Sequence, residues 1–372
     1  MTRTSHHRAL VALQTIPDFG LRRSKILLDR TGVKNAEDLF NLTIPDLLKI
    51  DGFGENIAKS FVEFDDWKQV DDILEKTSKI GAELISIDDE EYPEMLRHIY
   101  DPPLILWIKG NKEVLKKEGI AIIGTRRASS YGLSQTERWT TRLVESGLCI
   151  NSGLAYGIDA ASHRAALKAG GSTIAVLGSG IDVIYPRKNS GLAQQIIDSG
   201  GAVITEYPPG TQPDAGNFPE RNRIVSGMSH GVLVAESGVK GGSMITARCA
   251  LDQNREVFVI PHRLGYAKGE GCNYLIKTGQ GKLIQNTEDV LVELSIQTGE
   301  PADNREPENT WRSLDLDDDA IEICQLLEEG SLHIDQISEK TGKPTFQLHP
   351  LLLNLEMEGA IKQRAGKYFE LI

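Results

Sequence analysis

Ile120-Ala-Ile-Ile-Gly-Thr-Arg-Arg-Ala-Ser129 is the stretch that decides the fold of this chain. It joins an apolar, β-branched run to a turn of small and cationic residues, and an amphipathic stretch follows. The pattern recurs at Cys149-Ile-Asn-Ser-Gly-Leu-Ala-Tyr-Gly-Ile-Asp159 and at Val232-Leu-Val-Ala-Glu-Ser-Gly-Val-Lys-Gly-Gly-Ser-Met-Ile-Thr246. Strands that alternate with helices in this way predict an α/β fold with a mostly parallel, doubly wound sheet.

Further strands and helices are expected outward from these three stretches. The expected strands lie near 120–123, 148–151, 173–177, 202–205, 231–235 and 257–260. The expected helices lie near 132–146, 158–169, 189–199, 244–252 and 286–294. Two short strand candidates, 83–87 and 104–108, precede them on either side of the turn Asp101-Pro-Pro103.

The segments on either side of this sheet are predicted to be separate domains. Residues 1–81 are expected to be helical, and Leu48-Lys-Ile-Asp-Gly-Phe-Gly-Glu-Asn-Ile-Ala58 resembles a helix–hairpin–helix. Its Gly-Phe-Gly turn could present amides to a DNA phosphate, or it could simply pack two helices together. The sheet domain would span 82–294, and 295–316 has the composition of a linker. Residues 317–372 predict three helices and then two strands, the order of a winged helix.

Charge is spread unevenly over the 372 residues, whose net charge is −12. Residues 315–372 hold 5 Lys and Arg against 12 Asp and Glu, whereas 82–294 is close to neutral. A basic groove in the middle of the chain is therefore compatible with the composition. No apolar run approaches the ~18 residues of a membrane span, and the N-terminus lacks an apolar signal core, so we expect a cytoplasmic protein with no membrane partner.

Small residues at the ends of the predicted strands indicate one anion-binding crevice. Glycine and serine let backbone N–H groups approach an anion, and the N-terminus of the following helix adds partial positive charge. Such loops gather at the carboxyl ends of parallel strands. The candidate nucleic-acid-binding residues of these loops are Gly124, Thr125, Arg126, Ser129, Ser152, Gly153, Arg187, Lys188, Lys240, Gly241, Gly242 and Ser243.

Phe218-Pro-Glu-Arg-Asn-Arg223 adds an aromatic residue beside two arginines and an asparagine. A ring on which bases stack, with cations that hold the backbone, is the composition of a single-strand platform. Phe218, Arg221, Asn222 and Arg223 are therefore candidates too, and Pro219 favours an extended conformation for Phe218. The alternative is a capped helix with Phe218 in the core.

Catalytic and cofactor motifs are missing from these loops. The chain contains neither the G-x-G-x-x-G dinucleotide fingerprint nor a G-x-x-x-x-G-K-[ST] loop. The four cysteines are scattered without metal-ligand spacing, so we expect no metal and no cofactor. Asp159 and His163, one helical turn apart, are expected to be a helix cap and a polar lining residue rather than an acid–base pair.

The combined motifs resemble the DNA-processing protein A family (DprA, also called Smf). The strings that carry the resemblance are Tyr92-Pro, Asp101-Pro-Pro103, Gly124-Thr-Arg126, Ser152-Gly-Leu-Ala-Tyr-Gly-Ile-Asp159, Leu177-Gly-Ser-Gly-Ile-Asp-Val-Ile-Tyr-Pro186, Glu206-Tyr-Pro208, Phe218-Pro-Glu-Arg-Asn-Arg223, Gly242-Ser-Met-Ile-Thr-Ala247 and Gly271-Cys-Asn-Tyr-Leu-Ile276. The resemblance implies an extended Rossmann domain that binds single-stranded DNA without sequence preference. It also implies a homodimer that helps to load the RecA recombinase in natural transformation.

The resemblance also assigns roles to individual residues. The phosphate-gripping arginine of the family falls on Arg126, a basic residue on Arg187, and the stacking aromatic on Phe218. A lysine that many members carry just before that aromatic is Ala215 here. The self-association surface falls around Leu275 and Ile276.

Two other function classes stay open from the sequence. One is a nucleotide-cleaving glycoside hydrolase of the lysine-decarboxylase-like family, with Glu206 or Glu236 as its acid, although the P-G-G-x-G-T string of that family is absent. The other is a pure interaction protein that works through the acidic winged helix. The third helix of that domain offers only Lys343 and His349 as cationic or titratable groups, which argues against duplex reading by it.

Overall fold

The computed structural model describes residues 3–33, 35–294, 311, 314, 316–328, 330–358, 360–364 and 368–371. The chain forms two compact units, Met1–Gln297 and Thr298–Ile372, and each is described by itself. Most of the linker expected at 295–316 lies outside the described residues. No helix of the described residues has the length and apolar character needed to cross a membrane.

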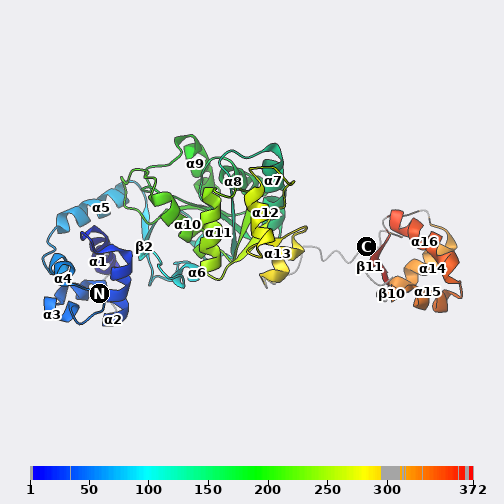
Figure 1. Ribbon diagram of the computed structural model, residues 1–372, viewed down its shortest axis with the longest axis horizontal. Helices are drawn as coiled ribbons and strands as arrows, with labels where there is room; N and C mark the ends of the chain where they lie inside the picture. Colours follow the sequence, from blue (N-terminus) through cyan, green and yellow to red (C-terminus); the bar gives the residue numbers. More distant parts are fainter. Residues whose placement is uncertain are drawn as a thin grey trace. The chain divides into compact units, whose positions relative to one another are not determined.

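A nine-stranded sheet organises the first unit, in the order β1-β2-β6-β5-β4-β3-β7-β8-β9. Figure 1 shows the helices that surround this sheet. Its strands are β1 (Glu83–Ser86), β2 (Ile105–Gly110), β3 (Gly119–Gly124), β4 (Cys149–Ser152), β5 (Thr173–Val176), β6 (Ala202–Thr205), β7 (Gly231–Glu236), β8 (Glu256–Val259) and β9 (Lys282–Leu283). The pairing in this sheet is parallel except at one edge, where β1 pairs antiparallel with β2 and β2 pairs antiparallel with β6. The mostly parallel α/β sheet and the eight strands expected from the sequence are confirmed; the short edge strand β9 was not predicted.

Helices cover both faces of the sheet. They are α6 (Glu94–Arg97), α7 (Ser130–Glu145), α8 (Ile158–Lys168), α9 (Ser190–Asp198), α10 (Asn217–Gly227), α11 (Gly242–Asp252), α12 (Glu270–Lys277) and α13 (Glu288–Glu293), with short 3-10 turns η2 (Lys112–Lys116) and η3 (Arg187–Asn189). Side chains of β3 alternate between the two faces of the sheet. Ile120 and Ile122 pack on one face with α7, α8 and α13. Ala121 and Ile123 pack on the other face with α10, α11 and α12. Burial on both faces explains the continuous apolar runs of these strands.

The order of the strands reverses at β3. From β3 the chain winds outward through β4, β5 and β6, and it then returns to place β7 on the other side of β3. Ligands of doubly wound sheets bind in the crevice at such a switch point, outside the carboxyl ends of the strands. The loops after β3, β4 and β7 meet at that place.

The N-terminal helices pack onto the edge of the sheet. They are α1 (Arg3–Thr15), α2 (Gly20–Thr31), η1 (Ala36–Asn41), α3 (Ile44–Leu47), α4 (Glu55–Val62) and α5 (Trp67–Lys79). They share one hydrophobic cluster with β2, β5 and α9, and Trp107 Nε1 of β2 donates to Thr77 Oγ1 of α5 over 3.1 Å. Phe53 of the hairpin lies against Phe19, with 5.7 Å between ring centroids. The hairpin thus helps to hold the helices together; a separate domain ending at residue 81, and a DNA contact by this hairpin, stay predictions.

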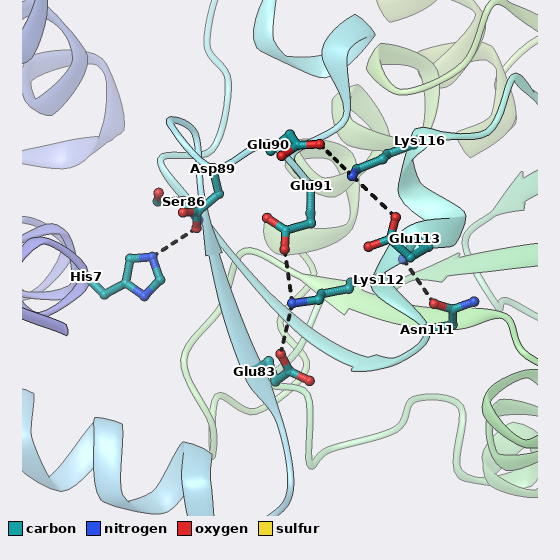
Figure 2. A network of polar contacts seen from close by, with 10 residues as sticks. All are labelled: His7, Glu83, Ser86, Asp89, Glu90, Glu91, Asn111, Lys112, Glu113 and Lys116. Carbon is teal, nitrogen blue, oxygen red and sulfur yellow. Dashed lines mark hydrogen bonds and ion pairs between the residues drawn. The ribbon is translucent and has the colours of Figure 1, made fainter. Parts of the chain in front are cut away.

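Figure 2 shows a polar network where α1, β1 and η2 meet. His7 Nε2 of α1 lies 3.0 Å from Asp89 Oδ2, which also accepts from Ser86 N over 2.7 Å. Two lysines of η2 lie among acids, Lys112 with Glu83 and Glu91 and Lys116 with Glu90 and Glu113. These contacts tie the first helix and η2 to the start of the sheet.

The second unit is a small winged helix, as expected from its sequence. It contains α14 (Asp318–Leu327), β10 (Leu332–His333), α15 (Ile334–Thr341), α16 (Thr345–Met357), β11 (Ile361–Arg364) and β12 (Tyr368–Leu371). The three strands pair in the order β10-β12-β11. Apolar residues of all three helices and of β11 and β12 form its core.

Candidate nucleic-acid interface

A cavity of about 830 Å³ opens at the switch point. Four segments supply most of its lining: the loop after β3, the loop after β4, the first turns of α10 and the start of α11. The predicted site residues among the lining are Gly124, Thr125, Arg126, Gly153, Phe218, Arg221, Asn222, Gly241, Gly242 and Ser243. The structure therefore brings ten of the sixteen nucleic-acid candidates to one place.

The buried carboxylate of Glu236 holds the loop after β3 in place. Glu236, at the end of β7, accepts from Ser129 Oγ over 2.7 Å and from Ser129 N over 3.0 Å. Ser129 Oγ in turn caps α7 by accepting from Gly132 N. A Cβ on Gly132 would overlap the Glu236 carboxylate, which explains the glycine. Ser129 thus positions the loop and does not line the cavity, contrary to its expected role.

Arg126 is one of three exposed cations that line the cavity, together with Arg127 and Lys268. Its Cζ lies 5.6 Å from the centroid of the Phe218 ring. Within the part of the chain that the structure describes, Arg126 makes no ion pair with an acid. Its N–H donors are available to a phosphate, to which a guanidinium can bind through two parallel hydrogen bonds.

Phe218 lies inside α10 and not in an extended segment, so that expectation was wrong. Pro219 stands in the first turn of the helix, where backbone N–H groups have no intrahelical partner and the missing N–H costs nothing. The ring is half-buried, lines the cavity, and packs against Tyr185 with 5.5 Å between centroids. It is therefore neither a free loop residue nor a core residue.

The two arginines of α10 do not both face the cavity beside Phe218, although the sequence suggested both as backbone-holding cations. Residues 218, 221, 222 and 225 line the cavity because helical neighbours three and four apart share one side. Arg223 points elsewhere and pairs with Glu206 over 2.5 Å and with Asp101 over 3.2 Å. Arg221 is buried in the cavity wall, where it donates to Gly153 O over 2.7 Å and to Val176 O. Burial lowers the pKa of Arg221 to about 10.

Four more predicted residues lie away from the lining. Ser152 is buried in β4 and donates to Ile122 O over 2.7 Å. Arg187 and Lys188 are exposed on η3, and Lys240 is exposed before α11. Ser152 is thus a structural residue of the sheet. The three cations remain candidates for contacts with a nucleic acid long enough to extend out of the cavity.

Sequence reasoning missed several lining residues, above all Arg127 and Lys268. Lys268 Nζ donates to Arg127 O over 2.9 Å, so the loop after β8 closes onto the loop after β3. Ala215 also lines the cavity. Lys268 adds a cation to the lining, but no local pattern around Lys268 signals that role.

Asp159 of α8 lines the cavity, whereas His163, one turn further along the helix, is buried and is not among the lining residues, contrary to its expected role. Burial raises the pKa of Asp159, opposed by the nearby charges of Arg221 and Arg126. His163 is fully buried, and its Nδ1 lies 2.7 Å from Thr173 Oγ1, which donates to Ile150 O. Nε2 of His163 has no partner among the described residues. Burial lowers the pKa of His163 to about 3, so it is a neutral structural residue and not half of an acid–base pair.

We expect His163 to make folding sensitive to acid. The folded state does not bind the proton that the unfolded state binds below pH 6.5, so stability falls as pH drops from 6.5 towards 3. The loss attributable to His163 between pH 7 and pH 5 is about 2 kcal/mol. Urea unfolding of His163→Asn, which keeps a donor for Thr173, should show a correspondingly weaker pH dependence. Equal pH dependence in both proteins would contradict this assignment.

The carboxylates required by the glycosidase alternative are not at the cavity. Glu206 is buried against Arg223, and Glu236 is occupied by Ser129 and by Tyr266, whose hydroxyl donates over 3.3 Å. Asp159 is the acid among the lining residues. Neither expected acid is positioned to protonate a leaving group there.

The two residues expected at a dimer interface differ in exposure. Leu275 is 1 % exposed and packs in the core under β7 and β8, so its assignment to a surface was wrong. Amphipathic α12 turns Leu275 inward because the residue lies on its apolar side. Ile276 is half-buried and stays a candidate.

Two sequence models of protein families match this chain. The sequence model described as DNA recombination-mediator protein A matches residues 83–295, more than half of the chain. The chain belongs to this family. A second model, the DprA winged helix domain, matches residues 307–367.

Relatives support this membership over most of the chain. Protein Smf of Escherichia coli K12 is 40% identical over 295 residues, 77% of each chain. The crystal structure of DNA processing protein A from Streptococcus pneumoniae has a TM-score of 0.68 at 34% identity and covers 80% of this chain and all of that one. The Helicobacter pylori homologue, whose structure concerns a single-stranded DNA binding mode, has a TM-score of 0.52 at 32% identity and covers 57% of this chain and 95% of that one.

Proposed function

We propose that this family member binds single-stranded DNA in the switch-point cavity, without sequence preference and without catalysis. The observation that carries the proposal is the Arg126 guanidinium placed over the Phe218 ring at the mouth of a glycine-lined cavity. The guanidinium would bind a phosphate and the ring would stack on a base. The two groups are close enough to contact the same nucleotide.

The rest of the lining suits a phosphate backbone. Gly241 and Gly242 open α11, whose first N–H groups have no intrahelical partner and whose N-terminus carries partial positive charge. Lys268 adds a cation on the same side of the cavity as Arg127. A backbone held by these groups leaves the bases free to stack, which explains binding without sequence preference.

The cellular role that we propose follows the family. The protein would protect incoming DNA in the cytoplasm during natural transformation and help to load the RecA recombinase, acting as a homodimer. The homologue described by its single-stranded DNA binding mode supports the first step. RecA filament assembly on strands already bound by this protein is the measurement that checks the second.

A titration tests the binding proposal directly. The protein should bind a poly(dT) strand more tightly than a duplex of equal length, and its affinity should fall steeply with salt as phosphate contacts release counterions. For single strands the expected slope of log K against log salt is about −0.7 per phosphate contacted. Fluorescence anisotropy at several salt concentrations measures both, and a flat salt response would refute a phosphate-gripping cavity.

The dimer proposal is tested at Ile276. Ile276→Glu places a charge on a half-buried apolar site and should shift the protein to monomer mass in sedimentation, whereas Ile276→Val should not. Circular dichroism checks that both variants fold. An unchanged dimer mass in Ile276→Glu would remove this part of α12 from the interface.

A further inference from the structure

Helix α16 of the winged helix is apolar on two opposite sides. Leu348, Leu352 and Leu355 are buried in the core of the unit. On the other side Phe346 is 71% exposed, Leu353 57% and Met357 79%. Their spacing of seven and four residues places the three on one stripe, which faces away from the buried leucines.

Such a stripe indicates a surface that binds another molecule. Single exposed apolar residues are ordinary, but three large ones aligned on one helix face are a feature of binding surfaces. Residues 346–357 span about 16 Å, three turns of helix. Apolar anchors at i, i+7 and i+11 lie along one helix face, the arrangement by which one amphipathic helix packs on another.

The charges near the stripe argue against DNA as its ligand. α16 contains no Lys or Arg between Thr345 and Met357. Lys343, just before the helix, pairs with Asp319 over 3.2 Å and with Glu322 over 2.9 Å. A phosphate backbone would therefore find no available cation on this helix, and affinity for nucleic acid depends on cations.

Acidic groups stand beside the apolar stripe instead. Glu356 and Glu358 are exposed on either side of Met357, and the C-terminus of a helix carries partial negative charge. With 12 acids against 5 cations in 315–372, two copies of this unit repel each other. Electrostatic complementarity thus selects a cationic partner over a second copy of the same surface.

We propose that the exposed stripe of α16, formed by Phe346, Leu353 and Met357, binds an amphipathic helix of a partner protein whose apolar side is flanked by Lys or Arg. The apolar residues of the partner cover the stripe, and its cations meet Glu356 and Glu358. This inference is independent of the proposed DNA site, because it uses no residue of the first unit. It assigns the winged helix to protein recognition.

The test uses the full-length protein and two synthetic 18-residue peptides, one amphipathic in Leu and Lys and one with every Lys replaced by Glu. The variant carries Phe346→Ser, Leu353→Ser and Met357→Ser, and the matched control carries Gln347→Ser and Asn354→Ser on an exposed polar side of the same helix. By fluorescence anisotropy, the Lys peptide should bind wild type and control equally, and the triple variant at least tenfold more weakly. The Glu peptide should bind wild type at least tenfold more weakly than the Lys peptide.

A second readout does not depend on the folding of the triple variant. Selective ¹³C-methyl labelling of methionine in the wild-type protein should show a shift of the Met357 signal, assigned with Met357→Leu, when the Lys peptide is added. An unmoved Met357 signal, equal binding by the triple variant, or equal binding of the Glu peptide would each overturn the proposal. A wild-type oligomer that the triple variant dissociates in sedimentation would overturn it in favour of a second copy.

Discussion

Replacing Arg126 with alanine is expected to weaken single-stranded DNA binding by about 10- to 100-fold. A charge-assisted hydrogen bond contributes about 1.5–3 kcal/mol, and 1.4 kcal/mol corresponds to one decade in affinity. The guanidinium is exposed and makes no ion pair within the described residues, so its loss leaves folding almost unchanged. Anisotropy with poly(dT) measures the effect, and thermal melting verifies the fold.

Two comparisons isolate the geometry of Arg126 from its charge. Arg138→Ala removes another exposed cation, one on α7 that does not line the cavity, and should change affinity little. Arg126→Lys keeps the charge but loses the planar fork, so it should bind between wild type and Arg126→Ala. If folded Arg126→Ala binds like wild type, or no worse than Arg138→Ala, the phosphate assignment fails.

Phe218→Ala is expected to weaken binding of homopolymers by about tenfold or more, whatever the base. Stacking on an aromatic ring contributes about 1–3 kcal/mol per base and is indifferent to base identity. The ring is half-buried between Tyr185 and Arg126, so its removal should cost less stability than the about 3–5 kcal/mol of a core phenylalanine. Phe218→Trp should preserve binding.

Two outcomes of this experiment separate the competing roles of Phe218. A large drop in melting temperature with intact DNA affinity would make it a packing residue of α10. A drop in affinity with an intact melting temperature supports the platform. Since Arg126 and Phe218 are in contact, the double variant should lose less than the two single losses together.

Much of the fold follows from periodicity in the sequence. Apolar β-branched runs such as Ile120–Ile123 are buried on both faces of the sheet, so they are recognisable without any partner in view. The glycine-rich turns are recognisable in the sequence as well. Positions where the backbone closely approaches neighbouring atoms, such as Gly124 and Gly241, favour glycine. These features of the sequence are sufficient to predict a cavity at the switch point.

What only the tertiary structure decided is the direction and the distant partners of individual side chains. Arg221 and Arg223 stand next to Phe218 in the sequence and were expected to act with it. Because α10 begins at Asn217, Arg223 instead pairs with Glu206 and Arg221 is buried against Gly153. Lys268 reaches the cavity from a loop 141 residues beyond Arg127, and Ser129 is held by Glu236 from 107 residues away. A local pattern specifies which elements form and which of their sides is apolar. Whether a polar side chain meets a ligand or a buried partner depends on contacts between segments far apart in the chain, and those exist only once the sheet has assembled.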